Sequence, residues 1–414
     1  MTIMTAPQPL WPGEMAPVSV VHVDLRDVAV PLAAAEGARG ALAIFWLDGR
    51  PVGERLFGPA ELPVPPAALR TLGSDLAGAK AARDALLSVP PAVDGGSVAV
   101  VVCTRDRLDD LDRCLTALRR CDPAPAEIVV VDNAPRRSAA EVVARHPGVR
   151  LVTEMRPGLS HARNRGVTET EAPFVAFTDD DVEVAPDWIG RLRARFDDES
   201  VASVTGIVLP QVLETEAMCL FEFAVGGLNG GYASRVYDRR FLQREWYKSA
   251  PVWQVGAGAN MTLRRAALAR VGLFDPRLGA GASGCSEDSE LWNRLLVGGL
   301  TCVYDPAIVV HHRHRADGAG LARQLRSYME GHVVALMVQY RQDRSRAHIA
   351  RTFFFVPRHF VKLWLAALWH GNRSGRKVIG PQLRGWARGI AAAPRWLRRP
   401  GPPALAAEHE DPRA

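Results

Sequence analysis

Three consecutive carboxylates, Asp179, Asp180 and Asp181, follow the apolar segment PFVAFT in the middle of the sequence. Adjacent carboxylates repel one another unless a cation or solvent lies between them. Mg²⁺ and Mn²⁺ prefer such oxygen ligands and commonly complete their coordination with phosphate oxygens of a substrate. The alternative is an acidic turn with three solvated side chains. The run DDD alone leaves both interpretations open.

Two other apolar segments end in polar residues. Asp132 closes the segment EIVVVD, and Thr104 and Arg105 follow the segment SVAVVVC. Arg163 lies in RPGLSHARNRG, where we expect a helix to begin near Ser160 as its N-cap and to present its first amides to an anion. Each residue also has an ordinary alternative, namely an Asx turn for Asp132 and a solvated surface position for the arginines.

These polar residues must be positioned by the elements that precede them. Continuous apolar, β-branched runs are typical of strands buried on both faces of a parallel sheet. Strands alternating with helices predict an α/β fold with a mostly parallel sheet in three layers. Ligands of such sheets bind beyond the carboxyl ends of the strands, which is where the polar residues fall. The predicted strands are 97–103, 127–132, 149–154 and 173–181, separated by helices that begin near 108, 138 and 160.

Two further groups later in the chain have the chemistry of a reactive site. Glu287 and Asp288 open the predicted helix SEDSELWNRLL, where a carboxylate can act as a general base or simply favour the helix start. His312 and His314 belong to YDPAIVVHHRHR, and alternate residues of a strand share one face. These histidines suit metal coordination, phosphate contact or a surface position.

The run GAGAN (256–260) lacks the third glycine of a dinucleotide-binding fingerprint. We expect its glycines to allow a close approach of the backbone to a bound molecule.

Taken in order, these motifs resemble the family 2 glycosyltransferases of the GT-A fold. The resemblance covers about residues 97–315 and rests on CTRDR, VVDNA, RPGLSHARNRG, FTDDDV, GAGANMTLRRAAL and SEDSELWNRLLVGG. It implies an inverting transfer of a sugar from a UDP-, GDP- or dTDP-sugar to a saccharide or lipid-linked acceptor, with Mn²⁺ or Mg²⁺ as cofactor. CTRDR replaces the common PTYNR of the family, which leaves the base of the nucleotide open.

The resemblance also implies a role for each motif residue. Asp288, with Glu287 beside it, matches the catalytic base. We expect nucleotide binding by Thr104, Arg105, Asp132, Arg163 and Asp180, and metal binding by Asp179, Asp181, His312 and His314. One rival, a sugar-1-phosphate nucleotidyltransferase, would carry a GxGxR-type loop where CTRDR stands. Another rival is a catalytically silent carbohydrate- or lipid-binding protein, against which the intact DDD and ED elements argue.

Outside the motif region we expect two additional units. Residues 1–95 form a small β-rich module with strands at 19–26 and 41–57, a hairpin turn at Asp48-Gly49 and a helix over 66–88, followed by the linker VPPAVDGG. Residues 96–330 form the catalytic domain. Residues 331–414 form a helical, basic C-terminal extension.

The charge of the chain is divided between these units. Lys+Arg is 51 and Asp+Glu is 45, a formal charge of +6. Residues 341–400 hold 14 Lys/Arg and one acid, or 14 − 1 = +13, so the rest carries 6 − 13 = −7. Tryptophans interleaved with cations favour a membrane–water interface. A helical subdomain packed on the core and a nucleic-acid patch are the alternatives, and we expect membrane contact without nucleic acid.

Composition limits the compartment. The chain is 48% apolar and 23% charged, as in soluble globular proteins. Its six cysteines include no CxxC pair, which favours a reducing cytosol. We expect no signal peptide and no spanning helix, because no apolar run approaches about 20 residues without charges. The sequence therefore predicts a cytoplasmic enzyme peripheral to the cytoplasmic membrane.

Overall fold

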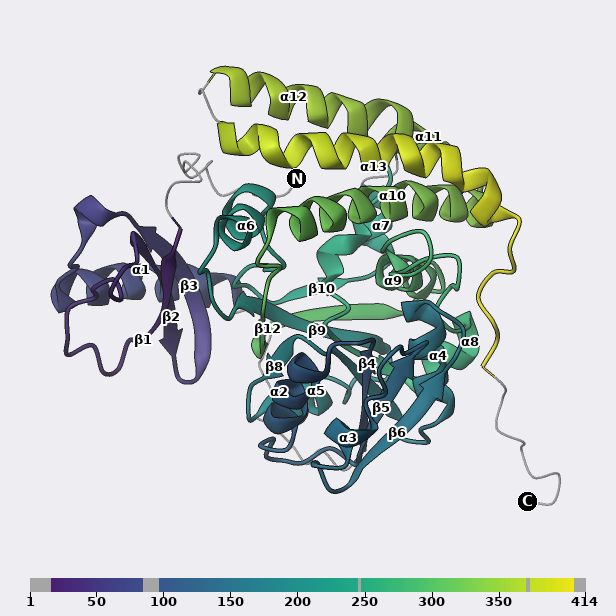
Figure 1. Cartoon of the computed structure of the whole chain (residues 1–414), viewed down its shortest axis with the longest axis horizontal. Helices are drawn as coiled ribbons and strands as arrows, with labels where there is room; N and C mark the ends of the chain where they lie inside the picture. Colours follow the sequence, from purple (N-terminus) through teal and green to yellow (C-terminus); the bar gives the residue numbers. More distant parts are fainter. Residues whose placement is uncertain (1–15, 85–96, 245–246, 370–372, 406–414) are drawn as a thin grey trace.

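A mixed sheet with mostly parallel strands forms the centre of the protein (Figure 1), here a computed structural model that describes residues 16–84, 97–244, 247–369 and 373–405. The strand order is β10-β12-β9-β11-β7-β4-β5-β6, with β8 paired to β12. Strands β7, β4, β5 and β6 are parallel, β9 and β12 are parallel, and β11 runs antiparallel between β7 and β9. The predicted mostly parallel sheet is confirmed. The strands are β4 (Val98–Thr104), β5 (Glu127–Asn133), β6 (Val149–Glu154), β7 (Phe174–Asp179), β8 (Val182–Val184), β9 (Val201–Pro210), β10 (Arg235–Tyr237), β11 (Asn260–Arg264) and β12 (Thr301–His312).

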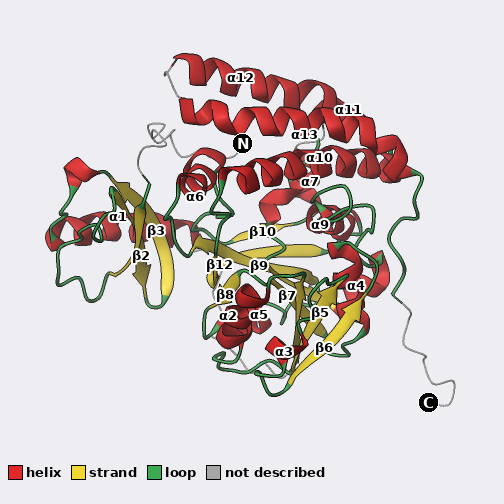
Figure 2. Ribbon diagram, in the orientation of Figure 1, coloured by secondary structure: helices red, strands yellow, loops and turns green. Residues whose placement is uncertain are grey.

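Helices cover both faces of this sheet, which gives the three predicted layers (Figure 2). The alternation along β4 shows why: Val100 and Val102 pack on one face and Val101 on the other, and all three are fully buried. One face is covered by α2 (Leu108–Leu118), α3 (Ala140–Val143) and α5 (Trp188–Ala194), and the other by α4 (Leu159–Thr168), α8 (Arg265–Val271) and α9 (Glu287–Val297).

The N-terminal residues form a small separate sheet with its own core. Strand β1 (Val18–Asp24) pairs in parallel with β2 (Gly40–Leu47), which forms a hairpin with β3 (Arg50–Phe57), and α1 (Pro66–Asp84) packs on them. The predicted hairpin turn is confirmed, because Asp48 and Gly49 both have positive φ, 53° and 70°. The predicted linker VPPAVDGG and the end of the helix predicted over 66–88 lie outside the described residues.

The C-terminal residues form a stack of long helices above the sheet (Figure 1). Helix α13 (Arg373–Leu397) packs along α10 (Gly318–Asp343), and α12 (Val356–Trp369) packs on α13 as the outermost helix. Helix α11 (Arg346–Ala350) and the π-helical segment η5 (Arg351–Phe355) lead into α12. No helix in the described parts of the chain is long and apolar enough to cross a bilayer.

Shorter elements complete the chain between the sheet and this stack. They are α6 (Glu216–Cys219), the π-helical segment η3 (Leu220–Val225), α7 (Arg239–Arg244) and the 3-10 turn η4 (Val252–Val255). One more 3-10 turn, η2 (Pro59–Glu61), connects β3 to α1 in the N-terminal unit.

Candidate active site

Three strand ends meet at one edge of the sheet. In the register of β5, β4 and β7, Asp132 pairs with Thr104, and Cys103 pairs with Asp179. The carboxylates Asp179, Asp180 and Asp181, here called the acid triplet, occupy the end of β7 and the turn into β8. Asp179 is the most accessible of them, with a side chain 35% exposed, whereas the other two are buried. The predicted convergence of the strand-end motifs is therefore seen in the structure.

Arg107, which the sequence reasoning missed, is the principal partner of the acid triplet. Its Nη1 lies 2.6 Å from Asp180 Oδ1 and 2.8 Å from Asp181 Oδ2. Its Nη2 lies 2.9 Å from Asp110 Oδ2 at the start of α2. Because this guanidinium contacts both Asp180 and Asp181, it offsets part of the repulsion between these two carboxylates. Arg107 is the last residue of CTRDR, but its partners in the acid triplet, Asp180 and Asp181, lie more than 70 residues away in the sequence.

The three acids differ in their protonation chemistry. Burial raises the pKa of Asp180 to about 7, although Arg107 and the hydrogen bond donated by Thr104 (2.8 Å) oppose the shift. Burial also disfavours the charge of Asp181, but His312 and Arg107 outweigh it and hold the pKa of that carboxyl far below its usual range. Both oxygens of Asp180 are bonded within the protein, so the structure shows it as an anchor between β4 and the β7–β8 turn.

A buried chain of side chains continues from the acid triplet. His312 Nε2 lies 3.5 Å from Asp181 Oδ1, and His312 Nδ1 lies 2.8 Å from Nδ1 of His314. His314 Nε2 in turn lies 2.8 Å from Oε2 of Glu222 in η3. Both ring nitrogens of His314 thus have protein partners, and His314 reaches the acid triplet only through His312. Glu222 was not anticipated, because no local motif marks it.

Arg163 joins the acid triplet to the start of α9. This guanidinium is 3% exposed and lies 2.7 Å from Glu287 Oε1, 3.4 Å from Asp179 Oδ1 and 3.2 Å from the carbonyl oxygen of Gly258. Its pKa is raised: burial alone would lower it, but the attraction of Glu287 and Asp179 outweighs burial. Helix α4, which carries Arg163, begins at Leu159 after Gly158 (φ 137°). The predicted N-cap Ser160 is therefore wrong, and its hydroxyl instead donates to the carbonyl of Leu278 (2.8 Å).

Asp288 is the more accessible acid of the pair that opens α9. Its Oδ2 accepts a hydrogen bond from the Gly258 amide (3.0 Å), and its Oδ1 accepts one from the Ser289 amide (2.6 Å). Glu287 is buried against Arg163, and burial raises its pKa to about 7. A Cβ on Gly258 would lie 2.8 and 2.9 Å from the guanidinium nitrogens of Arg163 and 3.1 Å from Asp288 Oδ2. The close approach predicted for GAGAN is thus made to protein side chains.

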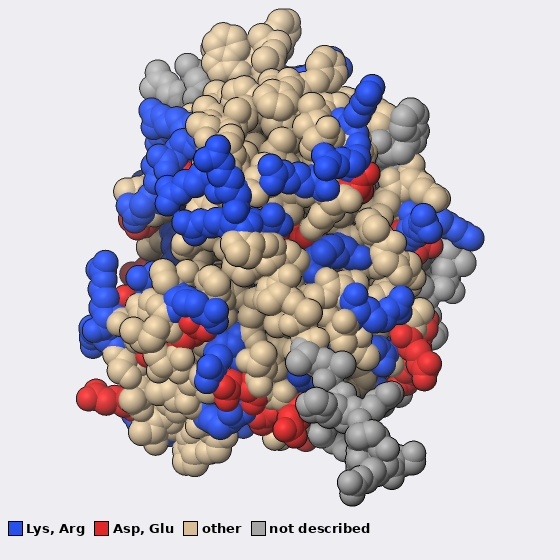
Figure 3. All heavy atoms as spheres, turned by 90° about the vertical axis from the view of Figure 1, so that its right-hand side faces the viewer, with Lys and Arg blue, Asp and Glu red and all other residues tan. Residues whose placement is uncertain are grey.

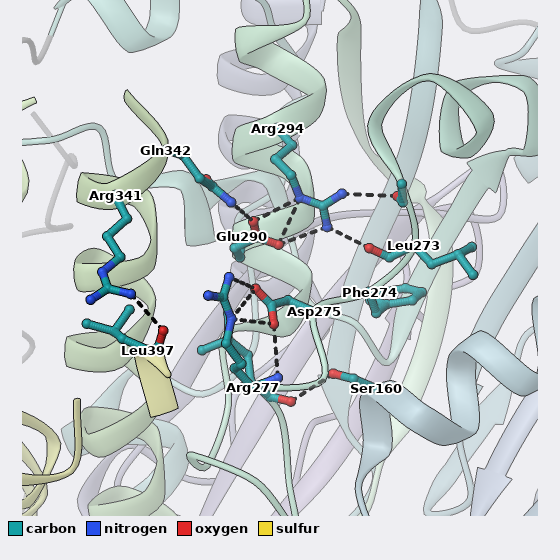
Figure 4. A network of polar contacts seen from close by, with 12 residues as sticks. Ser160, Leu273, Phe274, Asp275, Arg277, Glu290, Arg294, Arg341, Gln342 and Leu397 are labelled. Atoms are coloured by element: carbon teal, nitrogen blue, oxygen red, sulfur yellow. Dashed lines mark hydrogen bonds and ion pairs between the residues drawn. The ribbon is translucent and has the colours of Figure 1, made fainter. Parts of the chain in front are cut away.

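A polar network fixes α9 in place (Figure 4). Glu290 on α9 forms an ion pair with Arg294 (2.8 Å) and accepts a hydrogen bond from Gln342 of α10 (2.8 Å). Arg294 also donates to the carbonyl of Leu273 (2.8 Å), and Asp275 holds Arg277 in the same loop. Because these groups are largely buried, they hold the N-terminus of α9 at a set position beside the acid triplet.

Asp132 has a free acceptor. Its Oδ2 accepts a hydrogen bond from the Ala139 amide (2.8 Å), whereas its buried Oδ1 has no hydrogen-bond partner among the described residues. Burial raises its pKa. The neighbouring Asn133 holds the RPG loop through the Gly158 amide (2.8 Å), and Arg105 is exposed. A buried carboxylate oxygen without a donor suits an N–H group of a ligand.

The donor set around Asp179, Asp181 and His312 has the hard oxygen ligands that Mg²⁺ and Mn²⁺ prefer. Within the described parts of the chain, however, no three His, Cys, Asp or Glu side chains are arranged as a metal site. One reason is that both oxygens of Asp181 already have partners. Arg107 contacts Oδ2, and His312 faces Oδ1. The metal assignment, including His314, stays a prediction.

Comparisons with known proteins show which family the chain resembles. Residues 99–272 match the family model described as glycosyl transferase family 2. The pre-mycofactocin glycosyltransferase of Mycobacterium tuberculosis is 29% identical over 240 residues, which are 56% of this chain and 47% of that protein. The match thus spans about half the length of that relative. The succinoglycan biosynthesis protein ExoO of Rhizobium meliloti is 22% identical over 300 residues, 65% of this chain and 84% of that one.

A solved structure shows the same fold. The mannosyltransferase PcManGT from Pyrobaculum calidifontis, in complex with GDP-Man and Mn²⁺, superposes with a TM-score of 0.51 at 18% identity. The likeness covers 79% of this chain and 96% of that one. The GT-A type of sheet expected from the sequence is confirmed.

Proposed function

The chain belongs to the family 2 glycosyltransferases, and from this premise we propose that it transfers a sugar from a nucleotide diphosphate sugar to a hydroxyl of an acceptor, with inversion. One observation carries the proposal. The buried guanidinium of Arg163 contacts both Asp179 and Glu287, so the acid triplet and Asp288 lie at one site. A transferase needs this combination, because the leaving group of the donor and the nucleophile of the acceptor must be held next to each other in one site.

The donor would bind along the three strand ends. The free Oδ1 of Asp132 would accept a hydrogen bond from the base, and Thr104 and Arg105 border the same edge. Asp179 and Asp181, with His312, would hold Mn²⁺ or Mg²⁺. When bound, such an ion supplies Lewis-acid neutralisation of the diphosphate charge. Arg107 contributes a fixed positive charge close to the same place.

Asp288 would act as the base. Its carboxylate would take the proton of the acceptor hydroxyl, whose oxygen attacks the anomeric carbon as the bond to the diphosphate oxygen breaks. The hydrogen bonds from the Gly258 and Ser289 amides hold the carboxylate in place. Glu287 would position Arg163 and is occupied by that contact.

The experiment is release of nucleoside diphosphate from a panel of UDP-, GDP- and dTDP-sugars with Mn²⁺ or Mg²⁺, for the wild type and Asp288→Asn. We expect the variant to lose turnover by about 10²–10⁴-fold and to keep metal-dependent nucleotide binding by thermal shift. Glu141→Gln, an exposed acid in the first turn of α3, is the matched control and should retain activity. Turnover in Asp288→Asn would remove this residue from the mechanism. A wild type that binds a donor without turnover would instead indicate a catalytically silent binding protein.

We further propose a saccharide or lipid-linked acceptor and a role in polysaccharide or cell-envelope synthesis. The relative ExoO is named for succinoglycan biosynthesis, which supports this class of acceptor. A cytoplasmic location at the membrane surface, with contact through residues 341–400, belongs to the same proposal and is supported by the +13 charge of that segment.

A further inference from the structure

Helix α12 has two apolar faces, of which one is satisfied by packing. Val356, Phe360 and Ala367 are buried and pack with Ile379 of α13, and partly buried Leu363 and Trp386 join them. This inner face explains why α12 and α13 form a pair of helices. The same contacts show that α13 lies between α12 and α10 and is therefore part of the body of the protein.

The outer face of α12 and η5 is apolar and exposed, and we call it the α12 crest. Fourteen large apolar side chains are exposed in the described residues, and seven of them belong to the crest. Such a concentration differs from the single exposed apolar residues that any surface carries. Its members are Phe353 (53% exposed), Phe354 (58%), Val361 (57%), Trp364 (50%), Leu365 (54%), Leu368 (43%) and Trp369 (87%).

Charge selects the kind of partner. From residue 344 to residue 405 the sequence contains no Asp or Glu, and Arg358 and Lys362 are exposed on α12 itself. Figure 3 shows the upper end of the molecule as an uncharged cap above a belt of Lys and Arg. An apolar cap bordered by cations complements the acyl chains and anionic headgroups of a bilayer, and aromatic side chains favour that boundary.

The length of α12 determines how it would meet the bilayer. With 14 residues it is about 21 Å long, shorter than the roughly 30 Å of hydrocarbon that a spanning helix must cross. A short helix with one bare apolar face lies in the plane of the interface.

We propose that the α12 crest docks on an anionic lipid bilayer, with α12 parallel to the surface and its apolar side chains in the headgroup–acyl boundary. Within residues 341–400, α12 makes the contact and α13 connects it to α10. Docking is independent of the sugar transfer proposed above, because no crest residue touches the acid triplet, Arg163 or Asp288 in any hydrogen bond or ion pair of the described residues.

The test is partition of the full chain onto vesicles of phosphatidylcholine with and without about one third phosphatidylglycerol. The crest variant is Phe354→Ser/Leu365→Ser/Trp369→Ser. The matched control is Val30→Ser/Met155→Ser/Val236→Ser, which changes equally exposed apolar residues elsewhere (74%, 71% and 50%). A third variant, Arg358→Gln/Lys362→Gln, removes two crest charges.

We expect the wild type to bind the anionic vesicles, the crest variant to bind at least tenfold more weakly, and the control to stay within twofold of the wild type. The charge variant should bind the anionic vesicles about tenfold more weakly and show a smaller salt dependence. Thermal shift by nucleotide should be equal in all variants, which separates failure of docking from failure of the proposed function.

Three results would overturn the proposal. The first is a crest variant that binds anionic vesicles as the wild type does, and the second is a wild type that does not bind them. The third is a wild type that self-associates in sedimentation velocity without lipid while the crest variant is monomeric, because a second copy would then cover the crest.

Discussion

The buried contact between Arg163 and Glu287 allows a quantitative test of how the site is assembled. The two side chains are 3% and 7% exposed, and their charged atoms lie 2.7 Å apart. Arg163→Gln leaves Glu287 buried without its cation. Breaking a buried pair by removing one partner costs about 3–5 kcal/mol of unfolding free energy. We expect the upper half of that range, because Arg163 also contacts Asp179 and the Gly258 carbonyl.

The double variant Arg163→Gln/Glu287→Gln provides the control. With both charges gone, no uncompensated carboxylate remains at position 287, so part of the lost stability should return. The coupling energy from the double-mutant cycle should be about 2–3 kcal/mol. Urea unfolding followed by tryptophan fluorescence measures all four proteins.

The pH dependence of the unfolding free energy provides an independent test of this contact. The pKa of Glu287 in the folded protein is raised to about 7, above its usual range, so its stabilising contribution is present at low pH and is lost as pH rises through that value. Removing Arg163 raises the pKa further. The deficit of Arg163→Gln should therefore be smaller at pH 5 than at pH 8. A deficit below about 1 kcal/mol, or one that does not change with pH, would refute the argument that Arg163 joins the two halves of the site.

Two other perturbations test neighbouring parts of the structure. Glu54 of β3 accepts a hydrogen bond from the Tyr232 hydroxyl (2.7 Å), and burial beside Glu222 raises its pKa to about 7. The unfolding free energy should thus fall as pH rises from about 4.5 to 7. In urea titrations at several pH values, Glu54→Gln should reduce that fall by about 2 kcal/mol. A variant whose unfolding free energy changes with pH as that of the wild type does would contradict this. Gly258→Ala forces Arg163 to move, so transfer should drop by more than tenfold while circular dichroism stays unchanged; full activity would show that the loop can yield.

The sequence predicted the parts of the site that depend on local pattern. Apolar β-branched runs such as SVAVVVC are typical of buried strands, so Asp132 and Asp179 could be placed at strand ends in advance. The N-cap of α4 was misplaced by two residues, Ser160 instead of Gly158, and the Ser160 hydroxyl donates to the carbonyl of Leu278, a partner 118 residues away. A local capping preference cannot include such a competitor.

Long-range partners were the main omission. Arg107 lies in CTRDR and Glu222 lies in no motif, and the role of each in the site depends on contact with residues about 70 to 90 positions away. The C-terminal segment shows the same limit in another form. Its composition was compatible with a packed subdomain and with a membrane-binding surface. The structure distinguishes the two parts, because Ile379 of α13 packs against Phe360 on the inner face of α12 and leaves the outer face of α12 exposed. Amphipathic pattern reports that a face is apolar without reporting what covers it.

The charge balance of the site predicts how donor and metal depend on each other. Five carboxylates, those of the acid triplet, Glu287 and Asp288, are opposed by the two guanidiniums of Arg107 and Arg163. Burial raises the pKa values of Asp180 and Glu287 to about 7, so these two acids are partly protonated and the site without ligands has only a small excess of negative charge to attract a divalent cation, and none to attract an anionic diphosphate. Bound together, the two ligands would cancel each other. We therefore expect UDP or GDP to bind at least tenfold more tightly with Mn²⁺ than with EDTA, measured by calorimetry. Arg107→Met frees an oxygen of Asp181 and should tighten Mn²⁺ binding in the absence of nucleotide. If nucleotide affinity is the same with and without metal, the fixed arginines alone neutralise the diphosphate, and the acid triplet has a structural role.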